Sequence, residues 1–161
     1  MEKNRMKCLV VYYSRKGTTK IIGELIANEL NCDFEEIYDT KKRSGVIGFL
    51  RSGKDATFGK LTVLKKIEKN PELYELIILG TPVWNKRVSS PIRTYIAENN
   101  SKFRKVAFFC TEGKKGGQRT FELMAKLCDK TPISTLELTK KDIQKGLFNE
   151  EITKFTREII V

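Results

Sequence analysis

Short apolar runs alternate along the chain with longer segments in which apolar residues have helical spacing. The apolar or β-branched runs cover residues 7–13, 74–80, 105–110 and 133–138, with a weaker run at 34–38. Runs of this length predict strands, and the first three, which lack polar alternation, are typical of strands buried on both faces. The chain is therefore expected to contain a largely buried sheet.

Helical patterns occupy the intervals between these runs. One apolar face is evident in each of residues 18–30, 117–127 and 148–160. Ser90-Pro91 offers a capping hydroxyl followed by proline at the first helical position, which predicts a helix to about residue 98. The spacing of Leu61, Leu64 and Ile67 predicts a further helix over residues 61–69.

The resulting order of elements is βαβαβαβαβα. Because right-handed crossovers join parallel strands, this order predicts an α/β fold with one parallel sheet and helices on both faces. The 161 residues suit a single domain over 1–161, and no repeat or linker divides them. Residues 39–59 form an unusually long connection with several apolar positions, and we expect a short helix there that lies against the core.

The composition of the chain excludes several kinds of chemistry. Histidine is absent, which rules out Ser-His-Asp triads, Cys-His nucleophiles and His-Glu-x-x-His zinc sites. Cys8, Cys32, Cys110 and Cys128 form no Cys-x-x-Cys pair, so we expect reduced, buried thiols in a cytoplasmic protein and no metal site. The apolar runs are too short to cross a bilayer, and we expect no membrane insertion. Redox or transfer chemistry must then come from other groups or a cofactor.

The chain is strongly basic, with 31 Lys and Arg against 20 Asp and Glu and a net charge of +11. Such a charge favours contact with acidic proteins, anionic membranes or nucleic acid. The basic residues are spread along the chain, which is equally consistent with a solvated, Lys-rich surface. No clustered pattern of basic and aromatic residues supports specific nucleic-acid binding.

The loops that follow the strands form the candidate site, because ligands of open α/β sheets bind beyond the carboxyl ends of the strands. Before the next helix, the loop after the first strand contains Ser14, Arg15, Lys16, Gly17, Thr18 and Thr19. Hydroxyls, a glycine and helix N-terminal amides suit a phosphate, and the two basic residues add charge. An ordinary Ser/Thr-rich helix cap is the alternative, because the loop is neither a Walker A nor a Gly-x-Gly-x-x-Gly sequence.

Two further loops complete the candidate site. The loop over residues 80–87 contains Pro82, Val83, Trp84 and Asn85, and it places Trp84, the only tryptophan, beyond the end of a strand. An exposed indole that stacks on a flat ligand is favoured here over the core position that tryptophan more often takes. The loop after the third buried strand contains Thr111, Glu112, Gly113, Gly116 and Gly117, and its glycines let a ligand edge approach the backbone.

Together these segments resemble the flavodoxin family, including its flavodoxin-like oxidoreductases. The resemblance extends from residue 8 to residue 161 and rests on Tyr13-Ser14-Arg15-Lys16-Gly17-Thr18-Thr19, Gly80-Thr81-Pro82-Val83-Trp84, Ser90-Pro91-Ile92-Arg93 and Phe109-Cys110-Thr111, with residues 48–56 also similar. It implies a flavodoxin-like three-layer sandwich, in which a five-stranded parallel sheet has the order 2-1-3-4-5. It also implies one non-covalently bound FMN.

The resemblance also implies roles for the loop residues. Residues 14–19 would hold the FMN phosphate, residues 82–85 would line the isoalloxazine with Trp84 stacked on it, and Thr111, Glu112, Gly113, Gly116 and Gly117 would meet the pyrimidine edge or the other ring face. Lys16 replaces a hydroxyl or amide residue common in the family. Asn85-Lys86 stands where many relatives have a small residue and a glycine whose peptide turns towards the flavin, and positive φ at Lys costs about 1 kcal/mol or more.

Two redox functions follow from the resemblance. The first is an electron carrier between redox partners, and the basic charge makes an acidic partner protein the expected one. The second is an FMN-dependent NAD(P)H or quinone oxidoreductase, which needs room for a substrate over the flavin. No dedicated acid or base is evident, which favours the carrier. A non-redox module that binds an acidic partner or nucleic acid through its charge is a third alternative.

Overall fold

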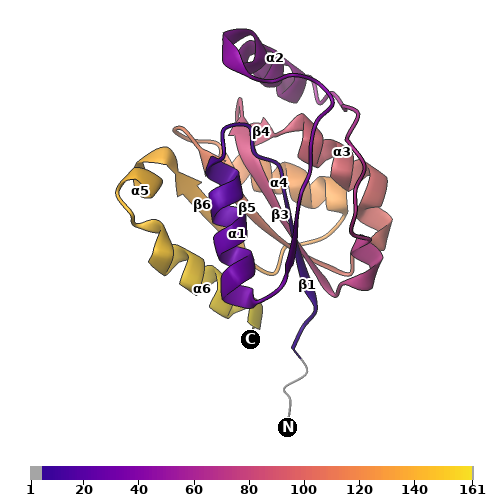
Figure 1. The fold of residues 1–161 in the computed structure, drawn as a ribbon, viewed down its shortest axis with the longest axis vertical. Coiled ribbons are helices and arrows are strands. Elements are labelled where there is room, and N and C mark those ends of the chain that lie inside the picture. Colours follow the sequence, from indigo (N-terminus) through magenta and orange to yellow (C-terminus); the bar gives the residue numbers. More distant parts are fainter. Residues whose placement is uncertain (1–4, 161) are drawn as a thin grey trace.

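The computed structural model describes residues 5–160. Its strands and helices are, in chain order, β1 (Cys8–Tyr12), α1 (Thr18–Leu30), β2 (Asp33–Glu36), α2 (Gly45–Thr57), β3 (Leu76–Trp84), β4 (Arg87–Val88), α3 (Ser90–Asn99), β5 (Lys105–Glu112), α4 (Gly117–Cys128), β6 (Thr135–Thr139), α5 (Lys140–Gln144) and α6 (Phe148–Ile160) (Figure 1). Short 3-10 turns, η1 (Pro71–Leu73) and η2 (Asn100–Lys102), precede β3 and β5.

The strands form a six-stranded sheet in which β2, β1, β3, β5 and β6 lie side by side in that order and run parallel. With β4 set aside, this is the predicted order 2-1-3-4-5. The predicted strand count is wrong because β4 pairs antiparallel with the end of β3, through Val83 with Val88 and Trp84 with Arg87. Positive φ angles of 49° at Asn85 and 59° at Lys86 make the tight turn that this hairpin needs.

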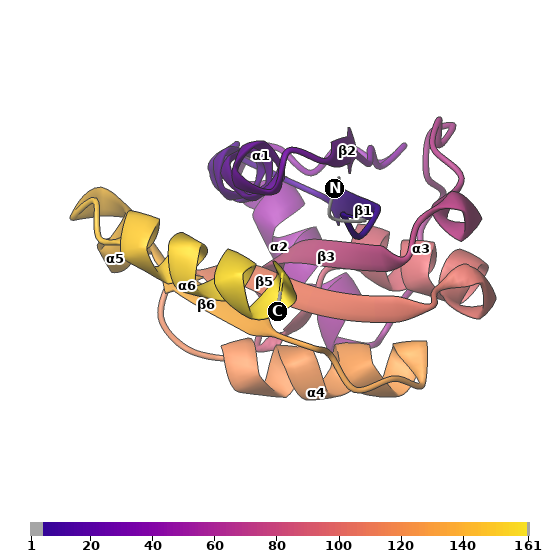
Figure 2. The same cartoon turned by 90° about the horizontal axis from the view of Figure 1, so that it is seen from below.

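Two apolar layers cover the sheet, as expected for strands that are apolar on both faces. Leu9 and Val11 point into the core shared with α3 and α4, whereas Val10 and Tyr12 point into the core shared with α1 and α6. Alternate side chains of one strand thus serve opposite layers. Figure 2 shows the sheet between α1 and α4.

The predicted helix over residues 61–69 is wrong. This segment runs irregularly beside β2, and the amide of Lys65 donates to the carbonyl of Tyr38 at 2.8 Å. The carboxylate of Glu35, in β2, accepts a hydrogen bond from the amide of Glu68. Distant partners therefore satisfy backbone groups that a helix would have satisfied within itself.

Three smaller expectations have mixed outcomes. The predicted helix in residues 39–59 exists as α2, but it lies against the core only through a few buried residues such as Ala56, and most of its large apolar side chains are exposed. The helix at residue 90 forms as α3, but its cap residue is Ser89 rather than Ser90, and no side chain caps it. All the cysteines are free, although Cys32 is only half-buried. None of the helices in the described part of the chain combines the length and hydropathy that a membrane crossing needs.

Candidate functional site

The carboxyl ends of β1, β3 and β5 bring the three predicted loops to one edge of the sheet. The hydroxyls of Thr19, in α1, and Thr111, in β5, lie 2.7 Å apart, so the first loop touches the third. A Cβ atom on Gly116 would lie 2.7 Å from the Cα of Lys86, so the third loop also lies against the β3–β4 turn. We call this place, where residues 14–19, 82–87 and 111–117 meet, the loop edge.

The first loop has the donor set that a phosphate requires. Gly17 has a φ of 97°, and no atom lies within 4 Å of the position that its Cβ would take. Its amide donates to the Ser14 hydroxyl at 3.0 Å, which holds the loop in shape, and Lys16 is exposed. The first amides of α1, from Thr18 onwards, have no partner within the helix. An open turn at a helix N-terminus therefore fits a phosphate dianion.

Thr19 and Arg15 have fixed partners inside the protein. The Thr19 side chain is buried, and its hydroxyl shares one hydrogen bond with Thr111, so the pair has a single proton left to donate to a ligand. Arg15 donates to the carbonyls of Arg43 at 2.7 Å and Gly45 at 3.0 Å. Arg15 therefore connects the first loop to the start of α2, a role for which the sequence carries no signal.

The Trp84 ring is buried, so the expectation of an exposed platform is wrong. The residue is the last of β3 and is only 8% exposed. The Tyr13 ring meets it edge-on with centroids 5.5 Å apart, and the guanidinium of Arg43 lies 5.1 Å from its centroid. Next to it, Pro82 and Val83 are half-buried, while Asn85 is exposed and its amide donates to the Thr57 hydroxyl of α2.

Arg43 is a site residue that the sequence did not indicate. It is 4% exposed and forms ion pairs with Asp39 and, at 3.0 Å, with Asp55 of α2. Its Nη2 has no hydrogen-bond partner among the described residues. Because it follows two other basic residues, Lys41 and Lys42, nothing in the local sequence distinguishes the buried cation from the exposed ones.

Glu112 ends β5 at the loop edge with an unpaired carboxyl oxygen. The residue is 6% exposed, and its Oε2 has no partner within residues 5–160. Burial, a hydrogen bond to Glu137 and the charge of Glu137 raise the pKa of Glu112 to about 7, against the lowering effect of the Gly117 amide. The Glu137 carboxyl lies where a Cβ on Gly117 would be, which explains the glycine there. A buried acceptor without a donor fits a ligand N–H group.

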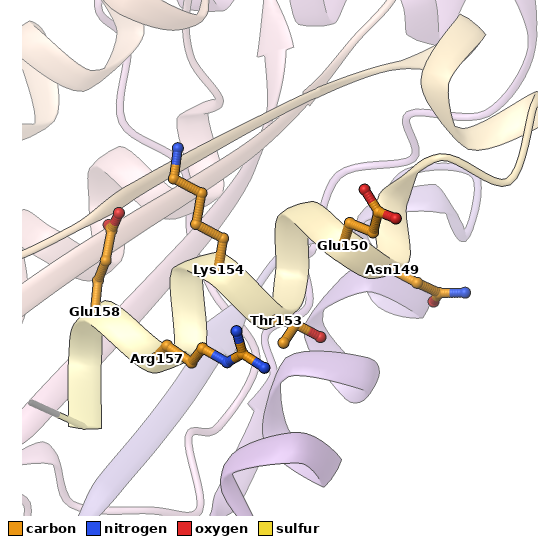
Figure 3. Close-up of a pocket in the computed structure, with 6 residues that line it drawn as sticks. All are labelled: Asn149, Glu150, Thr153, Lys154, Arg157 and Glu158. Atoms are coloured by element: carbon orange, nitrogen blue, oxygen red, sulfur yellow. The ribbon is translucent and has the colours of Figure 1, made fainter.

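Gly113 is exposed and Gly116 is half-buried, so the third loop is accessible from outside. A separate shallow hollow of about 450 Å³ follows the outer side of α6 (Figure 3) and is lined by Asn149, Glu150, Thr153, Lys154, Arg157 and Glu158. A single helix supplies all its groups, and none comes from the loop edge. The loop edge, where groups from three strands converge, is therefore the candidate site.

Comparison with known proteins defines the class of fold. No family model and no curated protein matches the chain. A flavoprotein from Lactobacillus acidophilus, solved in complex with FMN, is 22% identical over 87% of this chain and 97% of its own, with a TM-score of 0.73. A flavodoxin from Megasphaera elsdenii is 14% identical over 94% of this chain and 96% of its own, with a TM-score of 0.57.

An NADPH-quinone reductase from P. pentosaceus is 11% identical over 93% of this chain and 98% of its own, with a TM-score of 0.55. A flavodoxin and an NADPH-quinone reductase are thus both among the similar structures. At these identities the likeness concerns the fold. The chain has a flavodoxin-like fold, as the resemblance of its loops indicated.

Proposed function

We propose that the protein binds FMN non-covalently at the loop edge and carries electrons between redox partners. The observation that carries the proposal is the junction of the three loops, with an open glycine turn at one end and the unpaired Glu112 oxygen at the other. A similar fold in a protein solved with FMN supports it. FMN would supply the redox chemistry, which side chains alone do not provide.

Each loop has a distinct part in this proposal. The hydroxyls of Ser14 and Thr18 and the first amides of α1 would hold the phosphate, with Lys16 adding charge. The end of β3 and its turn would line the isoalloxazine. The unpaired oxygen of Glu112 would accept a hydrogen bond from the pyrimidine edge, which offers an N–H group. A flavin stacked on Trp84 would require Arg43 to leave the indole face that it now covers.

A second candidate, an NAD(P)H–quinone oxidoreductase, is favoured by one observation. The pKa of Glu112 is raised to about 7, so this carboxyl gains or loses a proton near neutrality. In that reaction NAD(P)H gives up a hydride, which supplies two electrons and one proton to the quinone, and a second proton from Glu112 or solvent completes the hydroquinone. Oxidation of NADPH in equal amounts with a supplied quinone would favour the enzyme, whereas its absence in FMN-loaded protein favours the carrier.

FMN and riboflavin, which differ by the phosphate, provide the direct test. We expect the purified protein to show the visible absorption of oxidised flavin and to bind FMN much more tightly than riboflavin. Gly17→Ala should weaken FMN about tenfold and riboflavin less, because alanine is strained at a φ of 97°. Gly53→Ala is the matched control, since Gly53 lies inside α2, has no positive φ and has open space at its Cβ position.

Calorimetric titration of both ligands into the apoprotein measures these affinities. Equal affinity for FMN and riboflavin in the unmodified protein would contradict the phosphate site. Failure to bind either ligand would contradict the proposed function as a whole.

A further inference from the structure

Helix α2 exposes an apolar surface that the described residues leave largely open, apart from the Arg15 guanidinium, which lies 5.4 Å from the Phe49 ring centroid. The helix stands at one end of the molecule (Figure 1), and only Gly48, Ser52, Asp55 and Ala56 of it are buried. Its first two turns expose Val46 by 76%, Ile47 by 75%, Phe49 by 62% and Leu50 by 65%, which we call the α2 tip. Contiguous apolar surface of this kind marks a site of interaction with a protein or a membrane.

Positive charge surrounds the α2 tip. Over residues 41–60 the exposed charged side chains are all basic, and we call them the basic flank: Lys41, Lys42, Arg51, Lys54 and Lys60. The only acid in this range is Asp55, which is buried and paired with Arg43 at 3.0 Å. The charge around the tip is therefore complementary to a negatively charged partner.

This charge and the shape of the tip decide between the possible occupants. A second copy of the chain would bring two basic flanks together, and each copy carries a net charge of +11. A folded acidic protein would need a hollow matching a helix end that protrudes, whereas a bilayer deforms around apolar side chains. Protruding apolar residues flanked by Lys and Arg are the pattern of helices that lie in the headgroup region.

We propose that the α2 tip and the basic flank dock the protein on an anionic lipid surface. The apolar side chains would enter the boundary between headgroups and acyl chains, and the ammonium and guanidinium groups would meet lipid phosphates. The docking is peripheral and needs no membrane-crossing segment. It goes beyond the proposed function and does not depend on FMN binding.

The rest of the structure holds the tip in place. Arg15 donates to the carbonyl of Gly45 at 3.0 Å, Arg43 pairs with Asp55, and Asn85 donates to the Thr57 hydroxyl. These contacts fix both ends of α2 to the loop edge. A helix already formed and presented loses little conformational freedom when it binds.

Sedimentation of the full-length protein with vesicles tests the proposal. We expect binding to vesicles of mixed phosphatidylglycerol and phosphatidylcholine that is about tenfold or more stronger than binding to phosphatidylcholine alone, and that weakens as salt rises. The double variant Ile47→Ser/Leu50→Ser should bind about tenfold more weakly. Its control is Leu73→Ser, because Leu73 is 63% exposed in η1, outside the tip.

A second pair of variants tests the charge. Lys54→Glu should weaken vesicle binding several-fold, whereas Lys126→Glu should not. The two substitutions are matched, since each removes a basic residue from the last turn of a helix, α2 or α4, and changes the net charge equally. Circular dichroism and thermal unfolding confirm that each variant is folded.

Several results would overturn the proposal. Folded protein that does not bind the anionic vesicles would do so. Equal losses of vesicle binding in Lys54→Glu and Lys126→Glu would do so as well. Self-association in sedimentation equilibrium that Ile47→Ser/Leu50→Ser abolishes would assign the tip to a second copy. Absence of vesicle binding together with Lys54-dependent binding of poly-glutamate would assign the surface to an acidic protein.

Discussion

Glu112 combines a buried carboxyl, a carboxyl neighbour and an unpaired oxygen at the candidate site. Burial and Glu137 raise its pKa to about 7. The folded protein therefore holds a proton that the unfolded chain, with an ordinary carboxyl, has already released. Between the ordinary carboxyl pKa of about 4.3 and the raised value, the free energy of unfolding falls as pH rises.

Replacing the Glu112 carboxyl by an amide should remove this loss of stability at higher pH. We expect Glu112→Gln to raise the free energy of unfolding by roughly 1–3 kcal/mol above neutral pH and to change it little below pH ~4, where Glu112 is protonated in both states. Urea unfolding at both pH values measures the difference. Glu122→Gln, at an exposed position of α4, is the control. An equal increase in the free energy of unfolding at both pH values would show that the increase does not come from the titration of Glu112.

At the residue scale, the sequence predicted which residues reach the loop edge better than it predicted their environment. Ser14, Gly17 and Glu112 were identified because they follow predicted strands. The burial of Trp84 could not be identified, because the residue that covers it, Arg43, precedes a different helix. The pKa of Glu112 likewise depends on Glu137, which lies on β6. Contacts between distant segments leave no local pattern.

Few buried groups hold helix α2 to the rest of the protein, so replacing any one of them should lower the free energy of unfolding. Arg43 and Asp55 are buried and paired at 3.0 Å, and Asp39 is the other partner of Arg43. Asp55→Asn should lower the free energy of unfolding by roughly 2–3 kcal/mol, because it removes one of the two charges that compensate a buried guanidinium. The loss should appear first as faster hydrogen exchange in α2.

A surface ion pair provides the comparison. Glu68 lies 3.8 Å from Lys66, and both side chains are largely exposed. Glu68→Gln should cost less than about 0.5 kcal/mol, since solvent screens this pair. Similar losses for the two variants in urea unfolding would contradict the buried role of Asp55.

At the element scale, the length and continuity of the apolar runs decided which helices and strands were predicted correctly. The strands β1, β3 and β5 were predicted because continuous apolar runs have no other stable place than a doubly covered sheet. The two-residue β4 was too short to leave a pattern. The apolar spacing over residues 61–69 fits a helix and also fits a segment held at the edge of β2, and the bonds to Tyr38 and Glu35 favour the second.

At the scale of the whole molecule, the excess of positive charge extends to the proposed flavin site. The three loops of that site contain one acid, Glu112, and six basic residues: Arg15, Lys16, Lys86, Arg87, Lys114 and Lys115. Positive charge favours the anionic, fully reduced flavin. One charge ~8 Å away at an effective dielectric of ~20 is worth about 2 kcal/mol, or about 90 mV, before screening by solvent. We therefore expect the second electron to enter at a less negative potential than in acidic flavodoxins.

A charge reversal tests this expectation. Lys86→Glu should lower that potential by roughly 20–90 mV in the FMN-loaded protein, and the shift should shrink as salt rises. Lys126→Glu, on α4, changes the net charge equally and should leave the potential almost unchanged. Redox titration followed by absorbance measures both. Equal shifts in the two variants would show that net charge, and not the loop edge, sets the potential.

The fold of the whole molecule was predicted more completely than its surface. Alternation of strands and helices predicted a parallel sheet with few possible topologies, and the resemblance to the flavodoxin family implied the order of its main strands. The position of α2 could not be predicted, because residues 39–59 contain basic and apolar residues without the periodicity of a core helix. That segment supplies Arg43 to the candidate site and the apolar tip to the surface.

The contact between Gly116 and Lys86 has a consequence for how such a site is modified. A Cβ at residue 116 would meet the main chain of Lys86, so any side chain there pushes the β3–β4 turn away from the third loop. The turn begins at Trp84, and its displacement would reach the indole ring and Arg43 upon it. The two loops therefore form a single structural unit, and grafting one of them into another scaffold requires the transfer of the other.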